Sequence, residues 1–197
     1  MNETKGIQVS ASSGLLSQTT IIPGLHLIER IQRGDKRGFF ERLFCAETML
    51  SLGWENGIAQ VNHSFTSQQG AVRGLHYQLS PFAESKLVSC VRGAVLDVVV
   101  DLRHGSPSFL QHVTIELSEQ NHRSVLIPPG CAHGFQTFSD DVDMFYCHSA
   151  IYAPSNEAGL NILDPRLQLH WPLPITQRSE RDLAFAFLSE DFEGVKL

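Results

Sequence analysis

The feature that most constrains the fold is the regular alternation of short apolar runs and turns between residues 58 and 152. The turn signals recur at intervals of roughly 8–12 residues, the spacing of an all-β sandwich or barrel. Arg92-Gly93 is one such tight turn between two apolar runs. The strands that this pattern predicts are residues 58–64, 71–78, 87–91, 94–102, 109–117, 124–127, 133–138 and 143–152. We therefore expect an all-β domain.

The N-terminal part of the chain is less regular. Residues 1–19 are rich in Ser, Thr, Gln and Gly and are expected to form a flexible arm, which leaves residues 20–197 as a single domain. Within that domain, residues 25–30 have the pattern of a strand, residues 33–38 are rich in turn formers, and residues 39–44 resume an extended pattern.

Two short helices are expected outside the strands. The first covers about residues 47–52, in the N-terminal half, and ends at Gly53. The second begins near the C-terminus, where Ser179 is a suitable N-cap and Glu180 and Asp182 lie in the first turn. Acidic residues are favourable there because they face the positive end of the helix dipole.

The composition is that of a globular protein. The 197 residues are 42% hydrophobic and 18% charged, which is enough for one domain with a full core. The formal net charge of −6 argues against a general nucleic-acid surface, although local arginines and lysines could bind a small anion. The four cysteines show no CxxC or metal-site spacing. Neither a signal peptide nor an apolar run of membrane-spanning length is visible, so we expect a cytoplasmic protein.

The residues with the most chemistry lie between Arg73 and Lys86, where a guanidinium, an imidazole and an ammonium group occur within fourteen residues. The alternation in residues 73–78 predicts a half-buried strand that places Arg73 on one face and His76 on the other. A histidine on one strand and a lysine heading a later one can converge inside a small barrel. Taken alone, His76 could equally be a core histidine with its hydrogen bonds satisfied.

Residues 73–78, Arg-Gly-Leu-His-Tyr-Gln, resemble a motif of the dTDP-4-dehydrorhamnose 3,5-epimerase family, a branch of the cupin jelly rolls. Further motifs follow in the family's order from about residue 23 to 186. They include Arg37-Gly38-Phe39-Phe40, Gln60-Val61-Asn62-His63-Ser64, Lys86-Leu87-Val88, Ile127-Pro128-Pro129-Gly130-Cys131-Ala132-His133, Tyr146, Tyr152-Ala153-Pro154 and Ser179-Glu180-Arg181-Asp182. The resemblance implies a jelly-roll sandwich and an isomerase that needs no cofactor and no metal.

The resemblance also implies a reaction, the inversion of C3, C5 or both in a dTDP-linked 4-keto-6-deoxysugar during deoxysugar biosynthesis. Inverting a carbon next to a ketone needs a base on one face, an acid on the other, and a donor at the ketone oxygen. The family pattern assigns these roles one by one. His76 would be the base and Asp182 its partner, Tyr146 the acid, Lys86 the group near the ketone oxygen, and His133 a pocket residue.

The nucleotide needs separate residues, because the sequence contains neither a G-x-G-x-x-G motif nor a P-loop. A diphosphate would be held chiefly by Arg73 and Arg37, whose guanidinium groups can bind phosphate oxygens bidentately. The resemblance adds further residues at the substrate, namely Gln60, Asn62, His133, Glu157 and Arg181. It also implies a homodimer by strand exchange, in which the Arg37 strand reaches into the neighbouring subunit's site.

Three positions depart from the family pattern. The family commonly reads R-G-F-F-x-E, whereas Glu41 directly follows Phe40 and Arg42 takes the usual Glu place. A shift of one residue on a strand reverses its face, so either a bulge restores Glu41 or the contact with the nucleotide base is altered. Val61 stands in place of an Asp, and Arg181 in place of a Lys. These changes bear on the identity of the substrate more than on the type of reaction.

Two other functions are open to a chain of this kind. A metal-dependent cupin enzyme typically needs His-x-His, a carboxylate and a later His, but Gln78 stands where the second His would be. A non-catalytic sugar-nucleotide binding module would be expected to lose His76, Tyr146 or Asp182, and all three are present. Each residue also has a structural alternative: Tyr146 as a core aromatic, Asp182 as a helix-start residue, Lys86 as a solvated side chain, and His133 as a turn residue.

Overall fold

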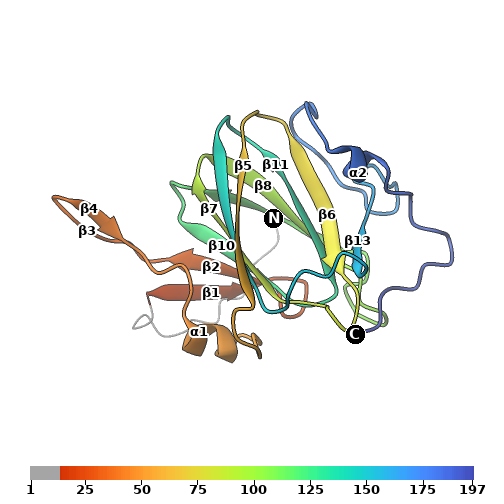
Figure 1. Ribbon diagram of the computed structural model, residues 1–197, viewed down its shortest axis with the longest axis horizontal. Helices are drawn as coiled ribbons and strands as arrows, with labels where there is room; N and C mark the ends of the chain where they lie inside the picture. The colour runs from red at the N-terminus through yellow and green to blue at the C-terminus, as the bar shows by residue number, and fades with distance from the viewer. Residues whose placement is uncertain (1–13) are drawn as a thin grey trace.

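The protein is a sandwich of two antiparallel sheets, seen in a computed structural model that describes residues 14–197 (Figure 1). The six-stranded sheet has the order β1 (Leu15–Thr19), β2 (His26–Arg30), β10 (Arg123–Ile127), β7 (Lys86–Arg92), β12 (Val142–His148), β5 (Gln60–Thr66). The five-stranded sheet has the order β13 (Glu157–Gly159), β6 (Val72–Gln78), β11 (Cys131–Thr137), β8 (Ala94–Asp101), β9 (His112–Ser118). The predicted all-β sandwich is confirmed.

Three smaller elements lie outside the two sheets. β3 (Arg33–Asp35) and β4 (Gly38–Phe40) form a hairpin that projects away from the sandwich (Figure 1). The helices α1 (Ala46–Ser51) and α2 (Glu180–Leu183) lie where the sequence predicts them. The Ser179 hydroxyl caps α2 by accepting from the Asp182 N–H at 3.1 Å.

Three apolar clusters hold the layers together. Alternate residues of the inner faces meet between the sheets, for example Val88 and Met144 from the first sheet with Val99 and Phe135 from the second. The segment around α1 covers the outer face of the first sheet, where Met49 is fully buried. The C-terminal segment covers the outer face of the second sheet. Both sheets are therefore fixed in position by burial on two sides.

The structure corrects several details of the sequence prediction. Residues 15–19, expected to end a flexible arm, form β1, because Leu15 is fully buried beside β2; residues 1–13 of that arm lie outside the described part of the chain. Residues 33–38, expected to be a loop, contribute a strand to the β3–β4 hairpin. The strand β13 was not predicted, since it is only three residues long. Within residues 14–197 no helix is long and apolar enough to cross a membrane.

The alternation expected along residues 73–78 is also wrong at one point. The register between β6 and β11 shifts: His76 is opposite His133, but Arg73 is opposite Phe135, so β6 carries one extra residue. A bulge of this kind changes the face of the residues beyond it. Arg73 and His76 consequently both line the same cleft, whereas strict alternation would place them on opposite faces.

Candidate active site

A cleft of about 860 Å³ opens between the inner faces of the two sheets. This volume is within the usual range for small-molecule sites. One wall comes from β5, β7 and β12 of the six-stranded sheet, and the other from β6 and β11 of the five-stranded sheet. Residues just before and within α2 form part of the rim. The cleft brings together ten of the eleven predicted site residues: Gln60, Asn62, Arg73, His76, Lys86, His133, Tyr146, Glu157, Arg181 and Asp182.

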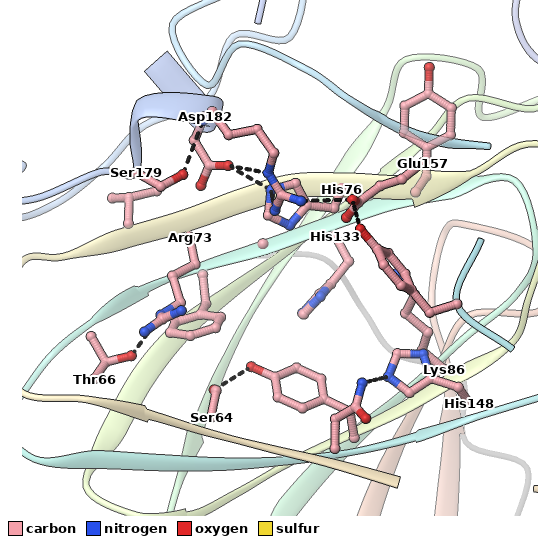
Figure 2. A pocket seen from close by; sticks show the side chains of 18 of the residues that line it. Ser64, Thr66, Arg73, His76, Lys86, His133, His148, Glu157, Ser179 and Asp182 are labelled. Atoms are coloured by element: carbon pink, nitrogen blue, oxygen red, sulfur yellow. Dashed lines mark hydrogen bonds and ion pairs between the residues drawn. The ribbon is translucent and has the colours of Figure 1, made fainter. Parts of the chain in front are cut away.

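His76 and Asp182 form a pair on the β6 wall (Figure 2). The His76 Nε2 lies 2.7 Å from Asp182 Oδ1, and the Gly74 N–H donates to Asp182 Oδ2 at 3.1 Å. Burial alone would raise the pKa of Asp182, but hydrogen bonds from His76, Gly74 and Ser179 lower that pKa to about 2. Asp182 is thus a fixed carboxylate beside the imidazole.

The contacts of Nε2 decide which nitrogen of His76 is available for chemistry. A carboxylate only accepts hydrogen bonds, so the 2.7 Å contact with Asp182 requires a proton on Nε2. The neutral ring then has Nδ1 as its acceptor. An Arg181 guanidinium nitrogen lies 3.0 Å from the same Nε2, but a guanidinium only donates, so it makes no hydrogen bond to the protonated Nε2 and donates instead to Glu157 at 2.7 Å. Asp182 therefore sets the tautomer in which Nδ1 can take up a proton, as in other His–carboxylate pairs.

Tyr146 comes from β12 on the opposite wall. Its hydroxyl is 3.0 Å from the Ser64 hydroxyl of β5, and its ring lies 6.4 Å from the His133 ring, centroid to centroid. Burial raises the pKa of Tyr146, and the nearby Asp97 carboxylate adds to this effect. The phenol is therefore neutral and retains a proton to donate.

Two further groups are held by buried carboxylates. The His133 Nε2 lies 2.7 Å from Asp97 Oδ2, and Asp97 is fully buried on β8. The Lys86 Nζ lies 3.2 Å from Glu84 Oε1, with the Lys86 side chain only 12% exposed. Lys86 is thus largely buried in the cleft wall.

The predicted nucleotide and sugar residues line the same cleft. Arg73 Nε donates to the Thr66 hydroxyl at 2.9 Å. This hydrogen bond joins β6 of one sheet to β5 of the other and holds the guanidinium group in one orientation. Gln60 Oε1 accepts from the Tyr152 N–H at 2.8 Å. Glu157 accepts from the Tyr152 hydroxyl at 2.7 Å as well as from Arg181.

Arg37 is the predicted site residue that this chain does not bring to the cleft. It lies at the tip of the β3–β4 hairpin, with a side chain that is 89% exposed and paired with Asp35. Glu41, whose direction the sequence left open, turns inward: its Oε1 is 3.2 Å from Arg30 Nε and its Oε2 is 3.4 Å from His122 Nδ1. Within this chain Glu41 is therefore part of a largely buried ion pair.

Sequence reasoning missed several polar residues in or directly behind the cleft walls, among them Ser64, His148, Glu84 and Asp97. Ser64 and His148 could have been found, because each lies two residues from a predicted site residue, Asn62 and Tyr146, on the same face of its strand. Asp97 carried no such signal, since its partner His133 is 36 positions away. Glu84 lies two residues before Lys86, but its other partner, His148, is 64 positions away. No group of three or more His, Cys, Asp or Glu side chains suited to a metal ion occurs within residues 14–197.

A jelly-roll sandwich with a histidine–carboxylate pair facing a neutral tyrosine across a nucleotide-sized cleft defines a cupin-type epimerase. A family model described as dTDP-4-dehydrorhamnose 3,5-epimerase matches residues 19–190. The chain belongs to this family, and it is an isomerase. The reaction class of the family is epimerisation of a dTDP-4-keto-6-deoxysugar, at C3 or at both C3 and C5.

Individual relatives agree with the family assignment. A dTDP-4-dehydrorhamnose 3,5-epimerase of Sinorhizobium fredii is 39% identical over 184 residues, which cover 91% of this chain and 94% of the relative. A crystal structure of the Legionella pneumophila dTDP-6-deoxy-D-glucose-3,5-epimerase, in complex with dTDP-4-keto-L-rhamnose, has 42% identity and a TM-score of 0.83; the match covers 88% of this chain and 92% of that one. The 3'-monoepimerase ChmJ of Streptomyces bikiniensis, in complex with dTDP-quinovose, has 34% identity and a TM-score of 0.79 and covers 85% of each chain.

Proposed function

We propose that this protein inverts C3, C5 or both in a dTDP-linked 4-keto-6-deoxy-hexose by removing a proton next to the C4 ketone and returning one to the opposite face. The observation that supports this most directly is that His76, with Asp182, and Tyr146 come from different sheets and enter the cleft from opposite walls. A sugar ring between the walls would have the base on one face and the acid on the other.

The proposed reaction has two proton transfers. The His76 imidazole takes the acidic proton next to the ketone, and Asp182 stabilises the imidazolium that forms. The enolate oxygen is stabilised by the Lys86 ammonium, a preformed donor in a largely buried position. Tyr146 then donates its proton to the carbon from the opposite face; solvent afterwards reprotonates Tyr146 and takes the abstracted proton from the His76 imidazolium.

The diphosphate in this proposal is bound by Arg73, which is already fixed by Thr66 and needs little further ordering. Gln60 and Asn62 line the same cleft from the β5 wall and would contact the nucleotide. Glu157 and Arg181 would lie near the sugar, because Arg181 approaches His76 at 3.0 Å.

Incubation of the protein with dTDP-4-keto-6-deoxyglucose in D₂O is expected to introduce deuterium at C3, C5 or both, because each inverted carbon receives its new proton from a solvent-exchangeable group. The position of the label is read by NMR or mass spectrometry and distinguishes a 3,5-epimerase from an enzyme that inverts one carbon. Folded protein that exchanges neither carbon, with this and several other ketosugar nucleotides, would contradict the proposal. Running the same assay with EDTA tests the metal-dependent alternative, for which exchange would be lost and restored by adding a transition metal.

We also propose that the protein is a homodimer in which the β3–β4 hairpin of one subunit carries Arg37 to the site of the other. Two observations support this. The hairpin projects from the sandwich (Figure 1). Its residues Phe39 and Phe40 are 62% and 67% exposed, an unusual exposure for two adjacent aromatic side chains. Arg37 itself is remote from the cleft of its own chain.

Co-expression of two impaired variants tests this arrangement. Arg37→Ala is expected to lower kcat/KM roughly 10- to 100-fold, the effect of losing a charged hydrogen bond to phosphate. A heterodimer of Arg37→Ala with His76→Ala contains one complete site if Arg37 acts on the neighbouring subunit, so co-expression should restore activity. If Arg37 acts within its own chain, both sites of the heterodimer remain defective and no activity returns. Sedimentation of the wild-type protein as a monomer would also contradict the proposal.

A further inference from the structure

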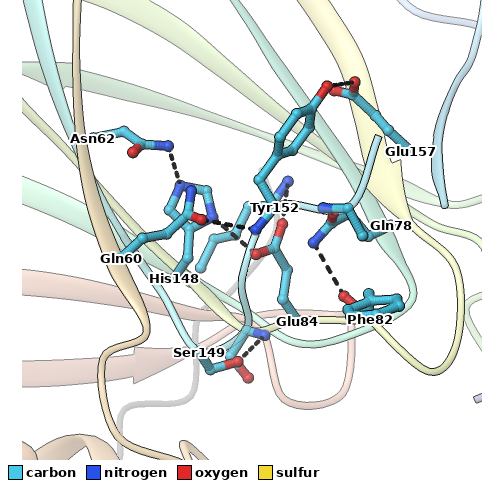
Figure 3. A network of polar contacts seen from close by, with 12 residues as sticks. Gln60, Asn62, Gln78, Phe82, Glu84, His148, Ser149, Tyr152 and Glu157 are labelled. Atoms are coloured by element: carbon cyan, nitrogen blue, oxygen red, sulfur yellow. Dashed lines mark hydrogen bonds and ion pairs between the residues drawn. The ribbon is translucent and has the colours of Figure 1, made fainter. Parts of the chain in front are cut away.

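The buried carboxylate of Glu84 connects Lys86 to His148, a further histidine of the cleft wall (Figure 3). The Glu84 side chain is only 5% exposed, and each of its oxygens has a partner: Oε1 lies 3.2 Å from Lys86 Nζ, and Oε2 lies 2.9 Å from His148 Nδ1. Burying a carboxylate is costly unless both oxygens are satisfied. The arrangement is therefore a closed network rather than a chance surface contact.

The network also fixes the protonation of His148. An ionised carboxylate only accepts, so His148 Nδ1 donates to Glu84, and Nε2 of the neutral ring is left as an acceptor. The Asn62 amide lies 3.3 Å from that Nε2 and can donate to it. The ring of His148 stacks on Tyr146 at 6.2 Å between centroids, with 28° between the planes. The same ring thus contacts Glu84, the partner of Lys86, as well as Asn62, and it stacks on Tyr146.

We propose that Glu84 and His148 are positioning residues that hold the Lys86 ammonium at the ketone oxygen, an inference that rests on the role proposed above for Lys86. A lysine carries its charge on a flexible four-carbon stem, and most of its orientations would not serve the reaction. The Glu84 carboxylate engages the ammonium and leaves its other N–H groups for the substrate. His148 in turn prevents Glu84 from rotating away. Stabilisation of an enolate depends on such preorganised donors.

A double-mutant cycle tests whether Glu84 acts through Lys86. Glu84→Gln, which keeps the shape and removes the charge, is expected to lower kcat roughly 10- to 100-fold with little change in KM, the effect of misplacing a catalytic group. Lys86→Met should lower kcat at least as much. The double variant should be no slower than Lys86→Met alone, because the two residues act as one unit.

The possible outcomes distinguish a failure of the role proposed for Glu84 from a failure of the role proposed for Lys86. Multiplicative losses in the double variant would show that Glu84 acts independently of Lys86 and would overturn the inference. Wild-type kcat in Glu84→Gln, together with a large loss in Lys86→Met, would overturn it while the role of Lys86 stands. Wild-type kcat in Lys86→Met would remove the role of Lys86 and the inference with it.

Two variants at His148 give an independent test, which also decides the matter if Glu84→Gln does not fold. His148→Asn keeps a donor near the Nδ1 position and should retain most of kcat. His148→Phe keeps the stacked ring but loses both hydrogen bonds, and should resemble Glu84→Gln. Equal kcat in the two variants would overturn the inference. Glu116→Gln, which changes an exposed carboxylate on β9, is the matched control and should leave kcat unchanged, with thermal unfolding recorded for every variant.

Discussion

Replacing His76 by alanine is expected to abolish turnover and deuterium exchange together. The imidazole is the group that starts the proposed reaction, and Asp182 holds it 2.7 Å away in the tautomer that can accept a proton. Loss of a general base costs roughly 10²–10⁴-fold in rate, and more where water cannot take its place. The measurement is deuterium incorporation at C3 and C5 beside the rate of product formation.

The control for this variant is His170→Ala, which removes an exposed histidine outside the cleft and should change neither rate. Retention of full exchange by His76→Ala, in protein with a normal unfolding temperature, would place the base elsewhere. Full exchange is also the result expected if His76 is only a core histidine with satisfied hydrogen bonds. The experiment therefore separates the catalytic from the structural interpretation of His76.

Tyr146→Phe is expected to uncouple exchange from inversion. The base, Lys86 and the shape of the cleft remain, so the enolate should still form. It cannot be protonated from the Tyr146 wall and should instead recover a proton from the His76 side. Deuterium should then enter at one carbon at least while net inversion falls, by roughly the 10²–10⁴-fold expected for a general acid.

The measurement compares label and configuration in the same recovered sugar nucleotide. His170→Ala again serves as the control, because His170 is exposed and lies outside the cleft. Wild-type inversion by Tyr146→Phe at every carbon that exchanges would show that Tyr146 is a core aromatic and that the proposed acid is wrong.

The sequence predicted most of the strands because they are buried apolar runs of strand length bounded by turn residues. It also predicted α2, because Ser179 and the acidic residues after it form a local capping signal that the structure confirms. Both kinds of prediction depend on residues that are close together in the chain.

The remaining features depend on contacts between distant segments, which no local pattern records. Gly74 is an example: a Cβ built there would lie 2.7 Å from Gly134 Cα and from the His133 carbonyl oxygen, and the residue has a φ of +111°. This close approach of β6 to β11 accompanies the bulge that brings Arg73 and His76 to one side. The link from Glu84 to His148 was missed for a similar reason, because Glu84 lies in a loop and His148 is 64 positions away.

The proposed acid, Tyr146, and the proposed base, His76, lie on different sheets, so the separation of the sheets would determine the distance between them. Packed sheets lie about 10 Å apart, a separation fixed by the side chains between them. Here those side chains include Val88, Val99, Phe135 and Met144. Tyr146 packs against the same apolar cluster. Their combined volume sets the gap that a hexose ring must span between base and acid. We therefore expect that adding or removing one methyl group in the core would change the distance between the proposed base and the proposed acid, and with it the rate of both proton transfers.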